Sequence, residues 1–148
     1  MKIKFAAGLA LLTLAIAAAP LAAQTYRMEA TIPFSFAVGS HTMPAGQYEI
    51  QSLARGVAKI YNQDSRKPLA VSYQPGAMSS SRMGGGEVIL VFHRYDEAYF
   101  LSEIRDGYSA TVYIFPEAQR ERELRRVATL GKPDEILIVV ARASFGAR

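Results

Sequence analysis

Residues 87–104 read EVILVFHRYDEAYFLSEI, which is two apolar runs separated by a short polar turn. The first run, Val88 to Phe92, is apolar on both faces, as is typical of a central strand that is covered on both sides. Tyr95-Asp96-Glu97 supplies a turn, and Ala98 to Ile104 returns as the hairpin partner. This stretch therefore predicts an antiparallel hairpin in the middle of a β-sheet.

Shorter runs on both sides of this hairpin predict the other strands. Every even position of residues 26–38 is apolar, which is the period of a half-buried strand. Pro33 lies within this run and indicates an edge position or a bulge, because proline cannot donate a hydrogen bond to a neighbouring strand. Strands are also expected at 108–115 and at 134–143, the last one buried and followed by a polar tail. Three more strands are expected at 47–53, 57–62 and 68–73.

Residues 74–86 differ in composition from the predicted strands. They contain a proline, a run of three serines and a run of three glycines, so a mobile loop is expected here. The glycines do not match a phosphate-binding loop, because Glu87 follows where a lysine is needed and a strand follows where a helix is needed.

One helix is predicted at residues 117–130, between Pro116 and Gly131. Glu121 and Arg125 have the spacing of a favourable ion pair on one helix face. The helix is rich in arginine, which has two interpretations: a solvated face, or a basic docking site that includes Arg120 and Arg122. Its narrow apolar stripe consists of Leu124, Val127 and Ala128.

Together these segments predict a mainly β fold, which is an antiparallel β-sandwich or a partly open barrel of about eight strands with one peripheral α-helix. A single domain is expected over residues 24–148, because this length suffices for one hydrophobic core. The chain has no cysteine. Packing alone must therefore hold the fold, and a thiol nucleophile or thiolate metal site is excluded.

The first 23 residues have the pattern of a secretory signal peptide. Two lysines are followed by the apolar residues Phe5 to Ala19, and the small residues before Gln24 predict cleavage after Ala23. The apolar run is shorter than the roughly 20 residues that a membrane-spanning helix needs, and Pro20 ends it. We therefore expect a periplasmic or extracellular protein that has no stable membrane span after removal of the signal peptide.

The charge balance argues against a nucleic-acid partner. The full chain carries a formal charge of +4. Two of its 17 basic residues, Lys2 and Lys4, lie in the predicted signal peptide, which leaves 15 basic residues against 13 acidic ones and a charge of about +2. This balance is too even for the basic surface that binds nucleic acid.

The turn of the central hairpin concentrates the residues that are best able to bind a ligand. The candidate ligand-binding residues are His93, Arg94, Tyr95, Asp96 and Tyr99. The spacing of the two histidines does not place two imidazoles on one metal ion, so neither a metal nor a cofactor is expected. No serine lies in a G-x-S-x-G turn, and no catalytic residue is assigned.

Three functions are compatible with these features. The first is an exported, non-catalytic binding or structural domain of the cell envelope or extracellular space, with the hairpin turn and residues 74–86 contacting an envelope protein, a peptide or a glycan. The second is a small outer-membrane β-barrel, because eight strands is the lower limit for that architecture. The third is a hydrolase that uses His93 with a nearby carboxylate.

Four short segments give the chain a resemblance to a known group of proteins. They are Ile32 to Phe36, Pro44 to Tyr48, Leu90 to Tyr95 together with Tyr99 to Leu101, and Arg120 to Glu123. On these segments the chain resembles an uncharacterised family of small, signal-bearing, β-rich proteins from soil bacteria. Family members often carry a glycine after the His-Arg-Tyr run, where this chain has Asp96. The resemblance implies an exported β-domain and no particular activity.

Overall fold

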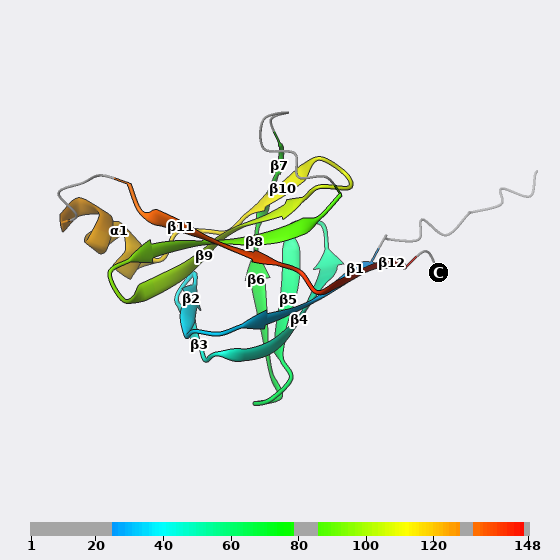
Figure 1. Ribbon diagram of the computed structural model, residues 1–148, viewed down its shortest axis with the longest axis horizontal. Coiled ribbons are helices and arrows are strands. Elements are labelled where there is room, and N and C mark those ends of the chain that lie inside the picture. Colours follow the sequence, from blue (N-terminus) through cyan, green and yellow to red (C-terminus); the bar gives the residue numbers. More distant parts are fainter. Residues whose placement is uncertain (1–24, 79–85, 128–131, 147–148) are drawn as a thin grey trace, which may run out of the picture.

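The computed structural model describes residues 25–78, 86–127 and 132–146, which form two β-sheets and one helix (Figure 1). A five-stranded sheet has the order β12-β1-β4-β5-β6. Its strands are β1 (Thr25–Ile32), β4 (Gly46–Ala54), β5 (Val57–Asn62), β6 (Lys67–Ser72) and β12 (Arg142–Gly146). A seven-stranded sheet has the order β11-β8-β9-β10-β7, with β2 beside β9 and β3 beside β2. Its strands are β2 (Phe36–Val38), β3 (His41–Met43), β7 (Gln74–Ala77), β8 (Val88–Tyr95), β9 (Ala98–Asp106), β10 (Thr111–Ile114) and β11 (Asp134–Val139).

The two sheets are separate layers that enclose one core, so the fold is a β-sandwich, the first of the two predicted architectures. In Figure 1, β8 and β9 cross over β5 and β6 rather than running along them. Every pairing between the described strands is antiparallel except the bridge between Ala37 of β2 and Phe100 of β9. The prediction of a mainly antiparallel β fold with one helix is confirmed.

The described residues contain twelve strands, whereas about eight were predicted. The additional ones, β2, β3, β7 and β12, have at most five residues each. β7 occupies the start of the predicted loop and pairs with β10, and Pro75 is tolerated there because β7 is an edge strand. β12 replaces the predicted polar tail and pairs with β1. Residues 79–85 of the predicted loop and the predicted signal peptide lie outside the described residues.

The segment 26–38, predicted as one strand, is divided between the two sheets. β1 ends at Ile32 and β2 begins at Phe36, so Pro33 lies where the chain passes from one sheet to the other. β1 is flanked by β4 and β12 and is therefore not an edge strand. The apolar alternation continues through this step because Ile32 and Phe36 are both buried in the shared core.

The core between the sheets is centred on aromatic side chains. Phe92 of β8 contacts the rings of Phe34 and Phe36 edge-on, with centroid distances of 5.2 and 5.3 Å. Val91 and Phe92 are neighbours in β8 and point to opposite faces of the sheet, yet both are fully buried. The β-bulge opposite them lies in β9, where Ser102 is an extra residue between Leu101 and Glu103. The side chains with no exposed surface include Tyr48, Ile60, Leu90 and Phe92. The prediction that β8 is a central, covered strand is confirmed.

β11 differs from the predicted buried strand. It lies at the edge of the seven-stranded sheet, and its described strand partner is β8. Ile136 and Ile138 pack against the core, whereas Leu137 and Val139 are 53% and 55% exposed. An apolar run shows that both faces can be buried, but it does not show that a second layer is present to cover them.

β10 begins at Thr111, three residues after the start of the predicted strand, because residues 107–110 form a turn. Asp106 is buried and holds this turn. Its Oδ1 accepts a hydrogen bond from the N–H of Tyr108 at 2.9 Å, and its Oδ2 accepts one from the hydroxyl of Ser109 at 2.6 Å. Aspartates commonly form turns in this way, by accepting from the backbone two residues later.

Gly46, the first residue of β4, is expected to be intolerant of a side chain. Its φ of +149° is one that residues with a Cβ rarely adopt, and a Cβ would lie 2.4 Å from Oδ2 of Asp64 and 3.0 Å from Nδ2 of Asn62. Oδ2 of Asp64 also accepts a hydrogen bond from the N–H of Gln47 at 3.0 Å. We expect Gly46→Ala to lower the free energy of unfolding by about 1–3 kcal/mol, measured by urea denaturation.

A double-mutant cycle separates the two causes of this cost. In an Asp64→Ala background one clash is absent, so Gly46→Ala should cost less than it does in the natural sequence. An equal cost in both backgrounds would assign the whole effect to the backbone conformation of Gly46. A cost below about 0.5 kcal/mol, the usual range for an uninvolved surface position, would contradict the prediction.

Candidate functional site

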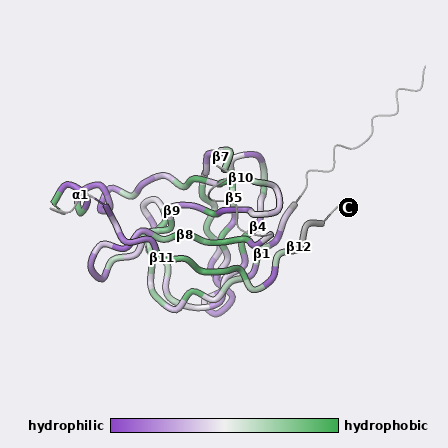
Figure 2. Tube along the Cα trace, turned by 45° about the horizontal axis from the view of Figure 1, so that its top comes forward, coloured by the Kyte–Doolittle hydropathy of each residue, from purple (hydrophilic) through white to green (hydrophobic). Residues whose placement is uncertain are grey.

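The helix α1 (Gln119–Val127) lies beside the β8–β9 hairpin at one end of the seven-stranded sheet (Figure 1). It begins two residues after the predicted start at Glu117, and residues 128–131 lie outside the described residues. Figure 2 shows α1 as largely hydrophilic, in contrast to β8 and β11. No helix in the described part of the chain has the length and apolar character needed to cross a membrane.

A small apolar cluster, separate from the main core, joins α1 to the sheet. It consists of Tyr95, Phe100 and Ala118, with Leu124 packed against them. The predicted apolar stripe is therefore only partly correct, because Val127 is 79% exposed. Ala128, its third member, lies outside the described residues. Because this apolar cluster is small, we expect a polar contact to supply much of the free energy that holds α1 against the sheet.

That polar contact is an ion pair between α1 and β8. Oε1 of Glu121 lies 2.7 Å from Nδ1 of His93, and the two side chains are 4% and 27% exposed. The predicted pair of Glu121 with Arg125 is not formed, because Glu121 faces the sheet; Arg125 instead pairs with Glu117 at 3.0 Å. A carboxylate buried this deeply is stable only when it is paired, and His93 provides the partner.

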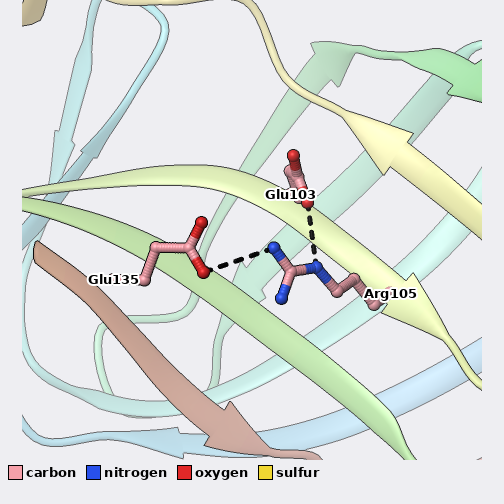
Figure 3. A network of polar contacts seen from close by, with 3 residues as sticks. All are labelled: Glu103, Arg105 and Glu135. Atoms are coloured by element: carbon pink, nitrogen blue, oxygen red, sulfur yellow. Dashed lines mark hydrogen bonds and ion pairs between the residues drawn. The ribbon is translucent and has the colours of Figure 1, made fainter. Parts of the chain in front are cut away.

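Further carboxylates make the surroundings of His93 acidic. Glu103 of β9 and Glu135 of β11 share Arg105, whose Nε lies 3.0 Å from Glu103 and whose Nη2 lies 3.4 Å from Glu135 (Figure 3). Together with Glu121, these carboxylates place three negative charges near His93, and the charge of Arg105 offsets one of them, which favours a proton on His93. The hydrogen bond to Glu121 is the main cause that raises the pKa of His93 above its ordinary value, and the charges of Glu121, Glu135 and Glu103 act in the same direction against the opposing effect of burial.

The predicted ligand-binding residues do not converge on one site. His93 and Tyr95 face α1, where Tyr95 is buried in the small apolar cluster. Arg94 and Tyr99 are cross-strand partners on the other face of the hairpin. Asp96 is exposed in the turn and has a φ of +55°, a conformation that glycine also adopts readily.

Arg94 and Tyr99 are each held by a neighbouring side chain. Nη2 of Arg94 donates to Oδ2 of Asp134 at 2.7 Å. The ring of Tyr99 stacks on that of Phe34, with a centroid distance of 3.9 Å. These contacts fix the end of the hairpin, and they occupy groups that sequence reasoning had assigned to a ligand.

The His93–Glu121 pair resembles the base and orienting acid of a hydrolase, but such an enzyme also needs a nucleophile within reach of the imidazole. Among the described residues, Glu121 is the one hydrogen-bond partner of the His93 ring. No group of three or more His, Asp or Glu side chains in these same ranges is placed to hold a metal ion. What the described contacts of the pair show is that it joins α1 to β8.

An open groove lies between β2, β3, β9 and α1. It has two adjoining parts, with volumes of about 280 and about 340 Å³. The bridge between β2 and β9 brings these distant segments together. The residues that line both parts are Ala37, Thr42, Phe100 and Arg120. This combination of apolar surface with a few polar groups is typical of a binding site.

No family model, curated protein or solved structure matches this chain. The resemblance to a family of exported β-rich proteins therefore stays a prediction. The functional argument rests on the chemistry of the groove and of the adjacent ion pair.

Sequence reasoning missed the burial of Glu121 and the contribution of Arg120 to the groove. Glu121 lies three residues before Leu124, which is the spacing of one helix face, so its position in the apolar stripe was a usable signal. Two interpretations of the arginine-rich helix were open from the sequence, and one of them placed Arg120 in a basic docking site. Nothing in the local sequence links Arg120 to Thr42. Both line one groove because β2 pairs with β3 and with β9, and α1 packs beside β9.

Proposed function

We propose that the protein is an exported, non-catalytic binding domain of the cell envelope or extracellular space, and that its ligand occupies the groove between β2, β3, β9 and α1. The observation that carries this proposal is the composition of the groove. Ala37 and Ala98 supply apolar surface, and the hydroxyl of Thr42 and the guanidinium of Arg120 supply polar groups. Such sites bind by shape and hydrogen bonding without chemistry on the ligand.

The arrangement of the ionisable groups supports a non-catalytic role. His93 is engaged by Glu121, and Arg94 by Asp134. Neither histidine is among the residues that line the groove. A ligand in the groove would meet the guanidinium of Arg120 and the carboxylate of Glu123, which already accepts a hydrogen bond from Gln119.

Export is tested by fractionation of the expressing cell, combined with mass spectrometry of the N-terminus of the protein. We expect a periplasmic or extracellular species that begins at Gln24. A cytoplasmic species, or one that retains Met1 to Ala23, would contradict the proposal, because the signal-peptide pattern would then have no function.

Binding in the groove is tested by filling it with a large side chain. Thr42 is exposed and lines both parts of the groove, so Thr42→Trp should block the ligand without disturbing the core. The matched control is Thr31→Trp, at an exposed threonine of β1 in the other sheet. Immobilised arrays of short peptides and of oligosaccharides serve as probes. We expect Thr42→Trp to abolish the binding shown by the natural protein and Thr31→Trp to leave it unchanged; equal binding by both variants would place the ligand elsewhere.

A further inference from the structure

We infer that the ligand of this groove is a peptide that presents a carboxylate, and that Arg120 binds this carboxylate. The inference rests on the proposed function, since it names the chemical class that the groove would take. It depends on three observations about the groove. Arg120 has no ion-pair partner among the described residues, the carboxylate of Glu123 is hydrogen-bonded elsewhere, and the aromatic rings offer little open surface.

Arg120 is available to an anion. It is exposed, lines both parts of the groove and forms no ion pair with the described residues, whereas Arg94 and Arg125 are each paired with a carboxylate. A guanidinium group presents two parallel N–H donors that match the two oxygens of a carboxylate. The hydroxyl of Thr42 is a second donor that lines the same surface.

No described side chain of the groove forms an ion pair with Arg120. The carboxylate of the groove, Glu123, lies one helical turn from Arg120 but accepts a hydrogen bond from Nε2 of Gln119 at 3.1 Å. That bond lies along the helix, and no ion pair between Glu123 and Arg120 is formed in the described structure. A carboxylate from outside would therefore meet an unpaired guanidinium group rather than displace an existing partner.

The aromatic residues of the groove favour a peptide over a sugar. A sugar ring packs best against an open aromatic face, but one face of Tyr99 is covered by Phe34, at a centroid distance of 3.9 Å. Phe36 and Phe100 are each only 2% exposed, so neither offers a ring face. The small side chains of Ala37 and Ala98 leave room beside Arg120 for an apolar side chain of a bound peptide.

The test compares two probes that differ only in the C-terminal group. One is a mixture of N-acetylated tripeptides with a free C-terminal carboxylate, and the other is the same mixture with a C-terminal amide. Binding to the full-length protein is measured by isothermal titration calorimetry and ligand-observed NMR. We expect the carboxylate mixture to bind about tenfold more tightly, which corresponds to the loss of one charge-assisted hydrogen-bonded contact.

Two arginine variants assign that difference to one residue. Arg120→Gln should weaken binding of the carboxylate mixture about tenfold and leave the amide mixture unaffected. Arg122→Gln removes the same charge from an exposed position of α1 outside the groove and should change neither. Equal binding of the two mixtures, or equal effects of the two variants, would overturn the assignment to Arg120.

The Thr42→Trp variant separates failure of this inference from failure of the proposed function. If peptides bind and Thr42→Trp abolishes binding, but Arg120→Gln has no effect, the groove is the site and the carboxylate assignment is wrong. If neither mixture binds the groove, galacturonate and galactose are compared in the same assay. Binding of galacturonate that depends on Arg120 would overturn the peptide in favour of an acidic glycan, and no binding of any probe would overturn both proposals.

Discussion

Replacing Phe92 by alanine is expected to lower the free energy of unfolding by about 3–5 kcal/mol, the usual cost of removing a buried phenylalanine ring. Phe92 has no exposed surface and contacts Phe34 and Phe36 edge-on. These two residues lie where the chain passes from β1 into β2, so the cavity would open at the junction of the two sheets. The change is measured by urea denaturation of the purified protein.

Ile114→Ala is the matched control for this prediction. Ile114 belongs to the same sheet but is 42% exposed, so its truncation should cost less than about 1 kcal/mol. If Phe92→Ala cost as little as Ile114→Ala, the aromatic centre would not be what holds the sheets together. The assignment of the core would then be wrong.

The second large effect is expected at the contact between α1 and β8. His93→Ala leaves Glu121 buried without a partner, and breaking a buried ion pair costs about 3–5 kcal/mol. Because His93 is 27% exposed, water can reach the vacated site, and we expect about 2–3 kcal/mol near pH 6. The same variant should loosen α1, which is detected as faster amide hydrogen exchange in residues 119–127.

The contribution of this pair should depend on pH with a definite sign. The pKa of His93 is raised in the folded protein, above the value of about 6.5 for the unfolded chain. The stabilisation is therefore fully present below about pH 6.5, and it is lost as the pH rises through the raised pKa. The difference in stability between the natural protein and His93→Ala should shrink between pH 6 and pH 9.

Two further variants control for this interpretation. Glu121→Gln removes the main cause of the shift, so NMR titration should show the pKa of His93 falling towards its ordinary value. His41→Ala changes an exposed histidine of β3 and should leave amide hydrogen exchange in residues 119–127 as it is. A stability difference for His93→Ala that stays constant from pH 6 to pH 9 would show that the pair makes no ionic contribution.

The parts of the fold that were predictable are those in which the local pattern and the tertiary environment agree. Val88 to Phe92 is apolar on both faces and lies in a strand that is covered on both sides. Ile136 to Val140 has the same pattern, yet Leu137 and Val139 are exposed because β11 is at an edge. Periodicity reports which faces can be buried, and only the packing of the second layer decides whether they are.

The candidate site was less predictable because its residues come from distant segments. The hairpin turn concentrates polar residues, but neighbouring side chains of a strand point to opposite faces, so His93 and Arg94 serve different contacts. Thr42 and Arg120 lie far apart in the sequence and line one groove because β2 pairs with β9 and α1 packs beside that strand. Such a site follows from topology, which composition and spacing do not encode.

The most direct test of the account is an NMR titration of the isotopically labelled protein with the C-terminal carboxylate peptide mixture. We predict that the backbone amides with the largest shift changes are those of Ala37, Thr42, Phe100 and Arg120, which line the groove. The Nε–H signal of Arg120 should move with them. Shift changes confined to another surface, such as the exposed side of β11, would contradict the assignment of the groove as the binding site.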